Sequence, residues 1–356
     1  MELKAKLNNI FTDQIVGGSV VLIKGNEEIK YSYGYSSLVD KKLVEEETIY
    51  RIASISKVII GMAAMKLVEE GKLNLDEDIS NILGFKIRNP KYPSIPITTR
   101  MLMLHKSSIT DGLEDESVEI GYNGVNGKHY FVSLEDLLLN KNSKYYTDET
   151  YSNNKPGDKY LYSNFGSGII ACIIEKCSGK LFTEFVEEKF LIPLNMDASF
   201  KANKILKQEK ISDTFKGFNT NRTAKSFIEG TYPDHPLGEN FRGPAGGLFV
   251  SMQDLSKIMI ALMNDGKYKE IEILKKEVVD ELFAMNFFAK REYLEKNLTL
   301  FGYTGGAYGV SSIMYFSKER KAGICFIANG GYYKPASTGL NNIQEAMISI
   351  LIDEIS

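Results

Sequence analysis

The chain has 356 residues, 43% of them hydrophobic and 25% charged, as is typical of a soluble globular protein of about two domains. A net charge of -3 argues against a nucleic-acid or anionic-membrane partner. The three cysteines, Cys172, Cys177 and Cys325, exclude a disulfide framework and form no metal-type Cys/His cluster. No apolar run approaches the roughly 18 residues of a membrane span. We therefore expect no metal, no membrane span and no nucleic acid.

Residues 1–11 predict a short amphipathic helix, and they lack the basic start and continuous apolar core of a signal peptide. The protein is cytoplasmic if this N-terminus is native, and extracytoplasmic if an export segment was removed. Residues 18–25 and 29–35 then predict two antiparallel strands, because the second segment alternates apolar and polar side chains and a Gly25-Asn-Glu-Glu turn separates them.

The next predicted element is an apolar helix that ends near Gly71 and begins with Ser54 three positions before Lys57. Residues three apart lie on one face of a helix, so the lysine amine is expected beside the serine hydroxyl. Residues 58–60 are apolar, and burial would make Lys57 a general base near neutral pH. The helix-start N–H groups would favour negative charge near Ser54. Alone, Ser-x-x-Lys is a weak signal because it occurs often by chance.

From residue 73 to 240 short helical segments alternate with polar loops. Within this region, residues two apart in extended backbone point the same way, so Tyr162 and Asn164 would face one cavity before a helix that begins near Phe165. The tyrosine hydroxyl could relay protons if a neighbouring ammonium lowers its pKa, and the amide could bind a substrate carbonyl. The alternative is that Asn164 caps the helix and Tyr162 belongs to the core. His105, in an apolar helical context, is predicted to be structural.

Strands return near the C-terminus, at residues 298–303, 311–316 and 323–329. A helix over 341–355 closes the chain. The predicted fold class is α+β, with a discontinuous sheet domain formed by residues 1–72 and 241–356, and a mostly helical domain formed by residues 73–240. A cleft between two such parts is a natural ligand site.

The glycine-rich segment 301–309 ends the first of these C-terminal strands. Glycines there let a ligand approach the backbone closely, and free N–H groups could hold an oxyanion or pair with an extended substrate. The alternative is a glycine-rich turn between two strands.

Taken together and in this order, the three signals resemble the serine β-lactamase and penicillin-binding-protein superfamily. The closer resemblance is to its branch of class C β-lactamases, D-alanyl-D-alanine carboxypeptidases, D-aminopeptidases and related esterases. Ser54-Ile-Ser-Lys57 is similar to the nucleophile motif, Tyr162-Ser-Asn164 to the tyrosine motif, and Tyr303-Thr-Gly305 occupies the place of the Lys-Thr-Gly or His-x-Gly strand motif. The surrounding segments 101–108, 190–196 and 243–251 also resemble the family.

The resemblance implies a β-lactamase/transpeptidase-like fold, an antiparallel sheet flanked by helices beside a mostly helical lobe, and acyl transfer without a cofactor. The substrate is then a small molecule or a peptide, and the oligomeric state stays open. The implied roles are Ser54 as nucleophile, Lys57 and Tyr162 in proton transfer, Asn164, Tyr303, Thr304 and Gly305 in substrate binding, and the N–H groups of Ser54 and Gly306 as the oxyanion hole.

One departure from the family pattern concerns substrate choice. Tyr303 stands where relatives that act on a free carboxylate usually carry Lys or His, unless Arg242 or another cation replaces that charge. The sequence therefore favours a serine hydrolase acting on an ester, an amide or a D-amino-acid-containing peptide. A β-lactamase or D-alanyl-D-alanine carboxypeptidase is the alternative, and a non-catalytic ligand-sensing module is the alternative of another class.

Overall fold

The computed structural model describes residues 2–115 and 117–355, and both ends of the chain contribute to one antiparallel sheet. Its seven strands follow the order β10-β11-β12-β13-β1-β2-β3. The central pair joins the two ends of the chain, with Val20 of β1 opposite Phe326 of β13. The strands are β1 (Gly17–Lys24), β2 (Glu27–Ser37), β3 (Lys42–Leu43), β10 (Ala289–Tyr293), β11 (Leu298–Ala307), β12 (Val310–Ser317) and β13 (Ala322–Asn329).

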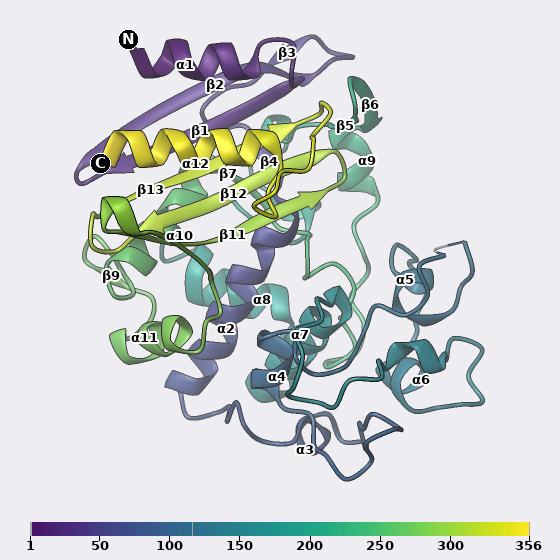
Figure 1. Cartoon of the computed structure of the whole chain (residues 1–356). Helices are drawn as coiled ribbons and strands as arrows, with labels where there is room; N and C mark the ends of the chain where they lie inside the picture. Colours follow the sequence, from purple (N-terminus) through teal and green to yellow (C-terminus); the bar gives the residue numbers. More distant parts are fainter. Residues whose placement is uncertain (1, 116, 356) are drawn as a thin grey trace.

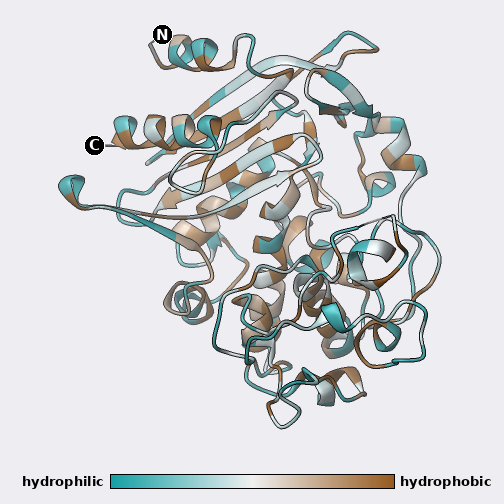
Figure 2. Cartoon of the chain, turned by 45° about the vertical axis from the view of Figure 1, so that its right-hand side comes forward, coloured by the Kyte–Doolittle hydropathy of each residue, from teal (hydrophilic) through white to brown (hydrophobic). Residues whose placement is uncertain are grey.

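The sheet is covered by helices on both faces, so its central strands are buried throughout. Side chains alternate between the two faces: Phe326 packs with α1 (Glu2–Phe11) and α12 (Asn342–Ile355), whereas Cys325 and Ile327 belong to the larger core on the opposite face. That opposite face carries α2 (Ser56–Glu69), α10 (Met252–Met263) and α11 (Lys276–Ala284). In Figure 2 apolar residues gather on the strands and inner helices, and the outer loops are mainly hydrophilic. The predicted α+β architecture is confirmed.

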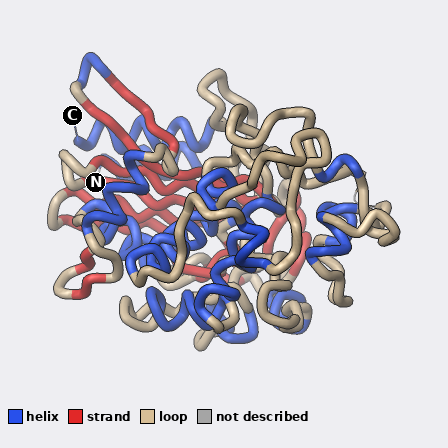
Figure 3. Tube along the Cα trace, turned by 90° about the horizontal axis from the view of Figure 1, so that it is seen from below, coloured by secondary structure: helices blue, strands red, loops and turns tan. Residues whose placement is uncertain are grey.

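The middle of the chain forms the helical part, seen from below in Figure 3 with its long loops at the right. Its helices are α3 (Ile79–Leu83), α4 (Thr99–Met103), α5 (Gly121–Val125), α6 (Leu134–Leu138), α7 (Asn164–Ser178), α8 (Phe182–Val186) and α9 (Ala224–Glu229). Three two-stranded ladders complete the structure: β4 (Ile49–Arg51) with β7 (Phe249–Ser251), β5 (Thr214–Lys216) with β6 (Asn219–Arg222), and β8 (Lys267–Tyr268) with β9 (Ile271–Glu272).

Helix α2 connects the two parts, because it packs against both α11 and α7. It is apolar and buried on nearly all sides, as expected for a helix enclosed by other elements. One continuous apolar core therefore extends from the sheet into the helical part. The division into domains at residues 72 and 240 stays a prediction. Within the described residues, no helix is both long and apolar enough to cross a bilayer, and no group of three His, Cys, Asp or Glu side chains is placed to hold a metal.

Candidate active site

Ser54 lies in a single turn of 3-10 helix, Ala53–Ile55, immediately before α2. The turn is held from two sides: Ile52 N–H donates to the Leu248 carbonyl at 3.0 Å, and the Ser312 hydroxyl on β12 donates to the Ile52 carbonyl at 3.0 Å. Ala53 is fully buried yet has a left-handed backbone with φ of 53°. A non-glycine residue in that region stores on the order of 1 kcal/mol of strain, a feature concentrated at functional sites.

Gly305 explains how strand β11 can lie against this turn. A Cβ atom at Gly305 would be 2.3 Å from Ser312 Oγ, 2.7 Å from the Ile52 carbonyl oxygen and 3.2 Å from Ser54 N. Only glycine therefore fits, and its neighbour Gly306 is exposed with open space around it. The predicted oxyanion pair, Ser54 and Gly306, thus comes from two segments in close contact.

Lys57 is buried below the serine, with only 2% of its surface exposed. Its Nζ lies 3.2 Å from Ser54 Oγ, 2.8 Å from Asn164 Oδ1 and 2.8 Å from the Ala245 carbonyl oxygen. Burial lowers the pKa of Lys57 to about 7, against an opposing effect of the Asp111 charge. A substantial fraction of the amine is therefore neutral at physiological pH and able to accept a proton.

Tyr162 completes the contact with the nucleophile. Its hydroxyl lies 2.7 Å from Ser54 Oγ, and the Lys57 Nζ lies 4.8 Å from its ring centroid. The expectation that an ammonium lowers the pKa of this phenol is wrong, because burial raises the pKa of Tyr162 and outweighs the hydrogen bond from Ser54. Tyr162 stays protonated, and Lys57 is the group poised to act as base.

Asn164 is held by a carboxylate that the sequence analysis missed. Asp111 accepts hydrogen bonds from Asn164 Nδ2 at 2.9 Å, Ser163 Oγ at 2.8 Å and Phe165 N–H at 2.8 Å. These contacts turn the Asn164 amide so that its oxygen faces Lys57. The alternative role of Asn164 as helix cap is wrong: α7 begins at Asn164, and the Ser163 side chain caps it by accepting from Gly166 N–H.

We expect the substitution Asp111→Ala to lower kcat/KM by about 10- to 100-fold, because it frees the Asn164 amide to rotate and leaves three donors without their acceptor. The unfolding free energy should also fall, by about 2–3 kcal/mol. Ester hydrolysis and urea unfolding measure the two effects. Asp158→Asn, at an exposed carboxylate that makes no side-chain hydrogen bond or ion pair with the described residues, is the matched control. Equal behaviour of the two variants would contradict the role given to Asp111.

His105 contacts both motif tyrosines, Tyr162 and Tyr303. Its Nδ1 accepts from Ser163 N–H at 3.2 Å, which leaves Nε2 as the protonated nitrogen, 3.4 Å from the Tyr303 hydroxyl. Its ring lies 4.6 Å from that of Tyr162. Burial and the Lys57 charge lower the pKa of His105 to about 4, so it is neutral. The predicted helical context is wrong: α4 ends at Met103, and His105 has a left-handed φ of 54°.

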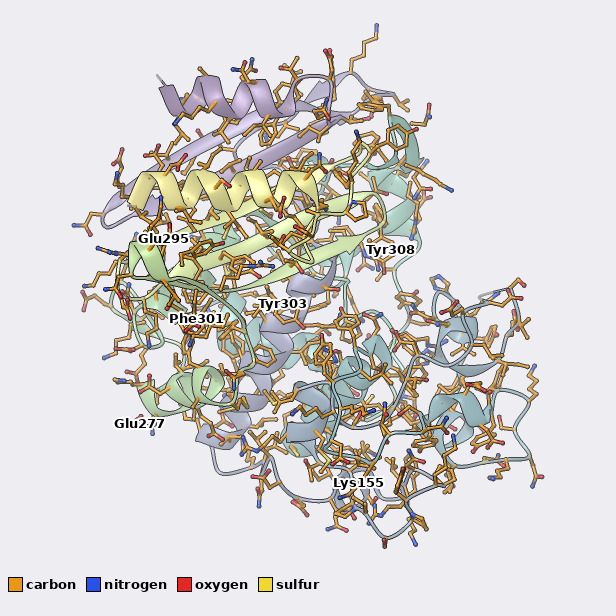
Figure 4. The ribbon with its side chains drawn as sticks, in the orientation of Figure 1. Lys155, Glu277, Glu295, Phe301, Tyr303 and Tyr308 are labelled. Carbon is orange, nitrogen blue, oxygen red and sulfur yellow. The ribbon has the colours of Figure 1, made fainter. Side chains whose placement is uncertain are left out.

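These groups open into one cavity of about 800 Å³ between the sheet and the helical part. Among the predicted residues, those that line it are Ser54, Tyr162, Asn164, Tyr303, Thr304 and Gly306. Lys57 and Gly305 lie behind this lining. Figure 4 labels Tyr303 on β11 and Tyr308 at the far end of that strand. The lining also includes Tyr122 of α5 and Asn126, within the segment 111–128 on which the sequence predicts that substrate choice depends, and Phe287, which the sequence did not indicate.

Arg242 does not supply the cation that Tyr303 lacks. Its guanidinium donates to the Lys128 carbonyl at 2.9 Å and lies 3.0 Å from His235 Nε2, outside the lining of the main cavity. The cations that do line this cavity, within the described part of the chain, are Arg51 and Lys106.

Comparison with known proteins identifies the family to which the chain is similar. A family model described as beta-lactamase matches residues 5–347. Protein flp of Staphylococcus aureus strain N315 is 25% identical over 328 residues, which cover 88% of this chain and 60% of the relative. The chain therefore spans about 60% of that relative's length.

Two solved structures share the fold over almost the whole chain. The octameric penicillin-binding protein homologue from Pyrococcus abyssi matches with a TM-score of 0.72 and 21% identity, covering 99% of this chain and 77% of that one. The D-amino acid amidase from Ochrobactrum anthropi SV3, complexed with L-phenylalanine amide, matches with a TM-score of 0.72 and 20% identity, covering 99% and 98%.

Proposed function

We propose that this chain, which belongs to the beta-lactamase family, is a serine hydrolase that acts through an acyl-enzyme formed on Ser54. The observation that carries the proposal is the single hydrogen-bonded group of Ser54, Lys57, Tyr162 and Asn164 at the base of an 800 Å³ cavity. A nucleophile within reach of a base, and a base oriented by a third group, is the arrangement that covalent catalysis requires.

In the acylation step, Ser54 Oγ attacks the substrate carbonyl carbon while its proton passes to the neutral amine of Lys57, 3.2 Å away. The carbonyl oxygen becomes an oxyanion between the N–H groups of Ser54 and Gly306. Tyr162, protonated and 2.7 Å from Ser54 Oγ, gives its proton to the leaving group as the carbon–leaving-group bond breaks, and regains one from Lys57. In deacylation the same proton transfers run in reverse. Water attacks the acyl carbon and loses a proton to Tyr162, whose own proton passes to Lys57, and Lys57 returns a proton to Ser54 Oγ as the bond to the acyl carbon breaks and the acid is released.

Tyr303 favours neutral substrates at one end of the cavity. Its hydroxyl is engaged with His105, and burial raises the pKa of Tyr303 well above its ordinary value, so the position carries no charge. A carboxylate on the leaving-group side of a substrate would therefore contact a neutral phenol at this position, and it would lack the ion pair that an ammonium could form. An ester, an amide or a D-amino-acid-containing peptide is therefore the favoured substrate class.

The direct test is covalent labelling. A fluorophosphonate should add to the wild-type chain in a one-to-one ratio by intact mass, and Ser54→Ala should remain unlabelled, with Ser337→Ala, at an exposed serine, as the control. An adduct that persists in Ser54→Ala would contradict the nucleophile assignment.

Turnover on a panel of p-nitrophenyl esters, D-amino-acid amides and nitrocefin separates the alternatives. Faster hydrolysis of nitrocefin than of the esters would favour a β-lactamase, despite Tyr303. Labelling of Ser54 with no turnover of any member would favour a ligand-sensing module.

A further inference from the structure

A second cavity of about 270 Å³ adjoins the catalytic one and shares two lining residues with it, Arg51 and Gly243. Arg51 lies three residues before Ser54 in the sequence. Because it lines both cavities, it forms part of the boundary between them. The other side of the second cavity is lined by Arg222 at the end of β6, with Phe227 and Tyr232. A substrate bound at Ser54 can therefore extend past Arg51 towards Arg222.

The two arginines are fixed in position but lack a carboxylate partner. The Arg51 guanidinium stacks 3.8 Å from the Tyr308 ring centroid, and its Nε donates to the Gly246 carbonyl at 3.1 Å. Arg222 stacks 4.3 Å from the Phe227 ring centroid, and one Nη donates to the Ser226 carbonyl at 3.2 Å. These contacts leave most of the five N–H donors of each guanidinium unused.

Two other arginines of the chain, Arg88 and Arg100, show the contrasting case of a guanidinium held by carboxylates. Arg88 pairs with Asp78, and Arg100 pairs with Asp76 and Glu281. Among the described residues, by contrast, no Asp or Glu lines either cavity. Arg51 and Arg222 line the same second cavity, and the charge of Arg51 adds to the effect of desolvation in lowering the pKa of Arg222. In a chain of net charge -3, this is an uncompensated positive site.

We infer that Arg51 and Arg222 form a subsite for an anionic group, a carboxylate or a phosphate, carried by the substrate of Ser54. Both arginines present planar forks that match such oxyanions, and binding one relieves their mutual repulsion. The inference rests on the proposed function, because it assigns the substrate class of the same catalytic serine.

The position of the subsite indicates which half of the substrate carries the charge. Tyr303 lies within β11 and Tyr308 in the turn that follows the end of this strand at Ala307, and Gly305 beside Ser54 lies between them. Tyr162, the proposed proton donor to the leaving group, contacts His105, which also contacts Tyr303. The leaving group thus belongs at the Tyr303 end, and the acyl group extends towards Tyr308 and Arg51.

The test compares two esters of equal acyl length, p-nitrophenyl hydrogen adipate and p-nitrophenyl hexanoate, which differ in a terminal carboxylate. Wild-type kcat/KM should favour the adipate ester by about tenfold or more, as one charge-assisted pair provides. Arg222→Gln should reduce the ratio to about one. Lys225→Gln, which removes an 81% exposed cation on the adjoining helix α9, should retain the wild-type ratio.

Inorganic phosphate distinguishes the two anion classes. Competitive inhibition of hexanoate hydrolysis by phosphate that is lost in Arg222→Gln would assign the subsite to phosphate, and an adipate preference without such inhibition would assign it to carboxylate. Equal rates on the two esters together with no phosphate inhibition would overturn the inference, while Ser54-dependent turnover would leave the proposed function standing. If neither ester is hydrolysed, fluorophosphonate labelling of Ser54 decides the proposed function separately, and calorimetric titration of adipate into Ser54→Ala and its Arg222→Gln double variant decides the subsite.

Discussion

Ser54→Ala, Lys57→Met and the double variant are expected to lose kcat/KM on a p-nitrophenyl ester by similar factors, on the order of 10⁴ or more. The reason is that the two residues act in one step. Among the residues that the structure describes, the Ser54 hydroxyl has no base other than Lys57 within 3.2 Å, and the Lys57 amine has no nucleophile other than Ser54 to activate. Groups that act as a unit lose their whole contribution when either is removed. Initial rates of the four proteins, with active-site titration of the wild type, measure the cycle.

Lys66→Met is the matched control, because Lys66 lies on the same helix α2 but pairs with Glu69 at 2.7 Å and does not line the cavity. It should retain nearly full activity. If the losses in Ser54→Ala and Lys57→Met multiply in the double variant, the two side chains act in separate steps and the assignment of Lys57 as the base of Ser54 is wrong.

Much of the fold could be predicted because the sheet has a strict periodicity. The C-terminal strands alternate between two apolar faces, so their positions followed from the pattern, and β11 differs chiefly in running four residues beyond the predicted end at Tyr303. The glycines at 305 and 306 suggested a turn, yet they continue the strand because Gly305 must lie against Ser312 and Ile52. The packing of β11 against the nucleophile turn, which is a tertiary contact, overrides the local signal.

The candidate site could be predicted only where its residues lie in short motifs. Ser54 and Lys57 are three apart, and Tyr162 and Asn164 are two apart, so local geometry brought each pair together. Asp111 is 53 residues from Asn164 and lies in a loop, so no spacing could connect them. Arg51 and Arg222 likewise meet only in the folded chain. Arg242 shows the converse: its charge suggested substrate binding, but folding directs it to Lys128 and His235.

Lys57, the residue proposed to activate Ser54, should also lower the free energy of unfolding. Burial lowers the pKa of Lys57 from 10.5 to about 7, and such a difference corresponds to on the order of 5 kcal/mol of unfavourable burial of the charged form. Lys57→Met retains the length of the stem and removes the charge, but it leaves Asn164 Oδ1 and the Ala245 carbonyl without their donor. The net gain expected at pH 6 is therefore about 2 kcal/mol in unfolding free energy.

The pH dependence of this gain identifies its cause. Between pH 7 and pH 10.5 the unfolded chain binds a proton at Lys57 that the folded chain does not, so the stability of the wild type rises with pH through this window. Below pH 7 both states are protonated, and the full cost of burial applies. Urea unfolding should thus show Lys57→Met to be more stable than the wild type at pH 6, with this difference reduced or reversed at pH 9.5. The difference between Lys66→Met and the wild type should be the same at both pH values. For Lys57→Met, a difference that is the same at the two pH values would mean that the folded lysine keeps its ordinary pKa. It would then be protonated at neutral pH, and it could not accept the serine proton.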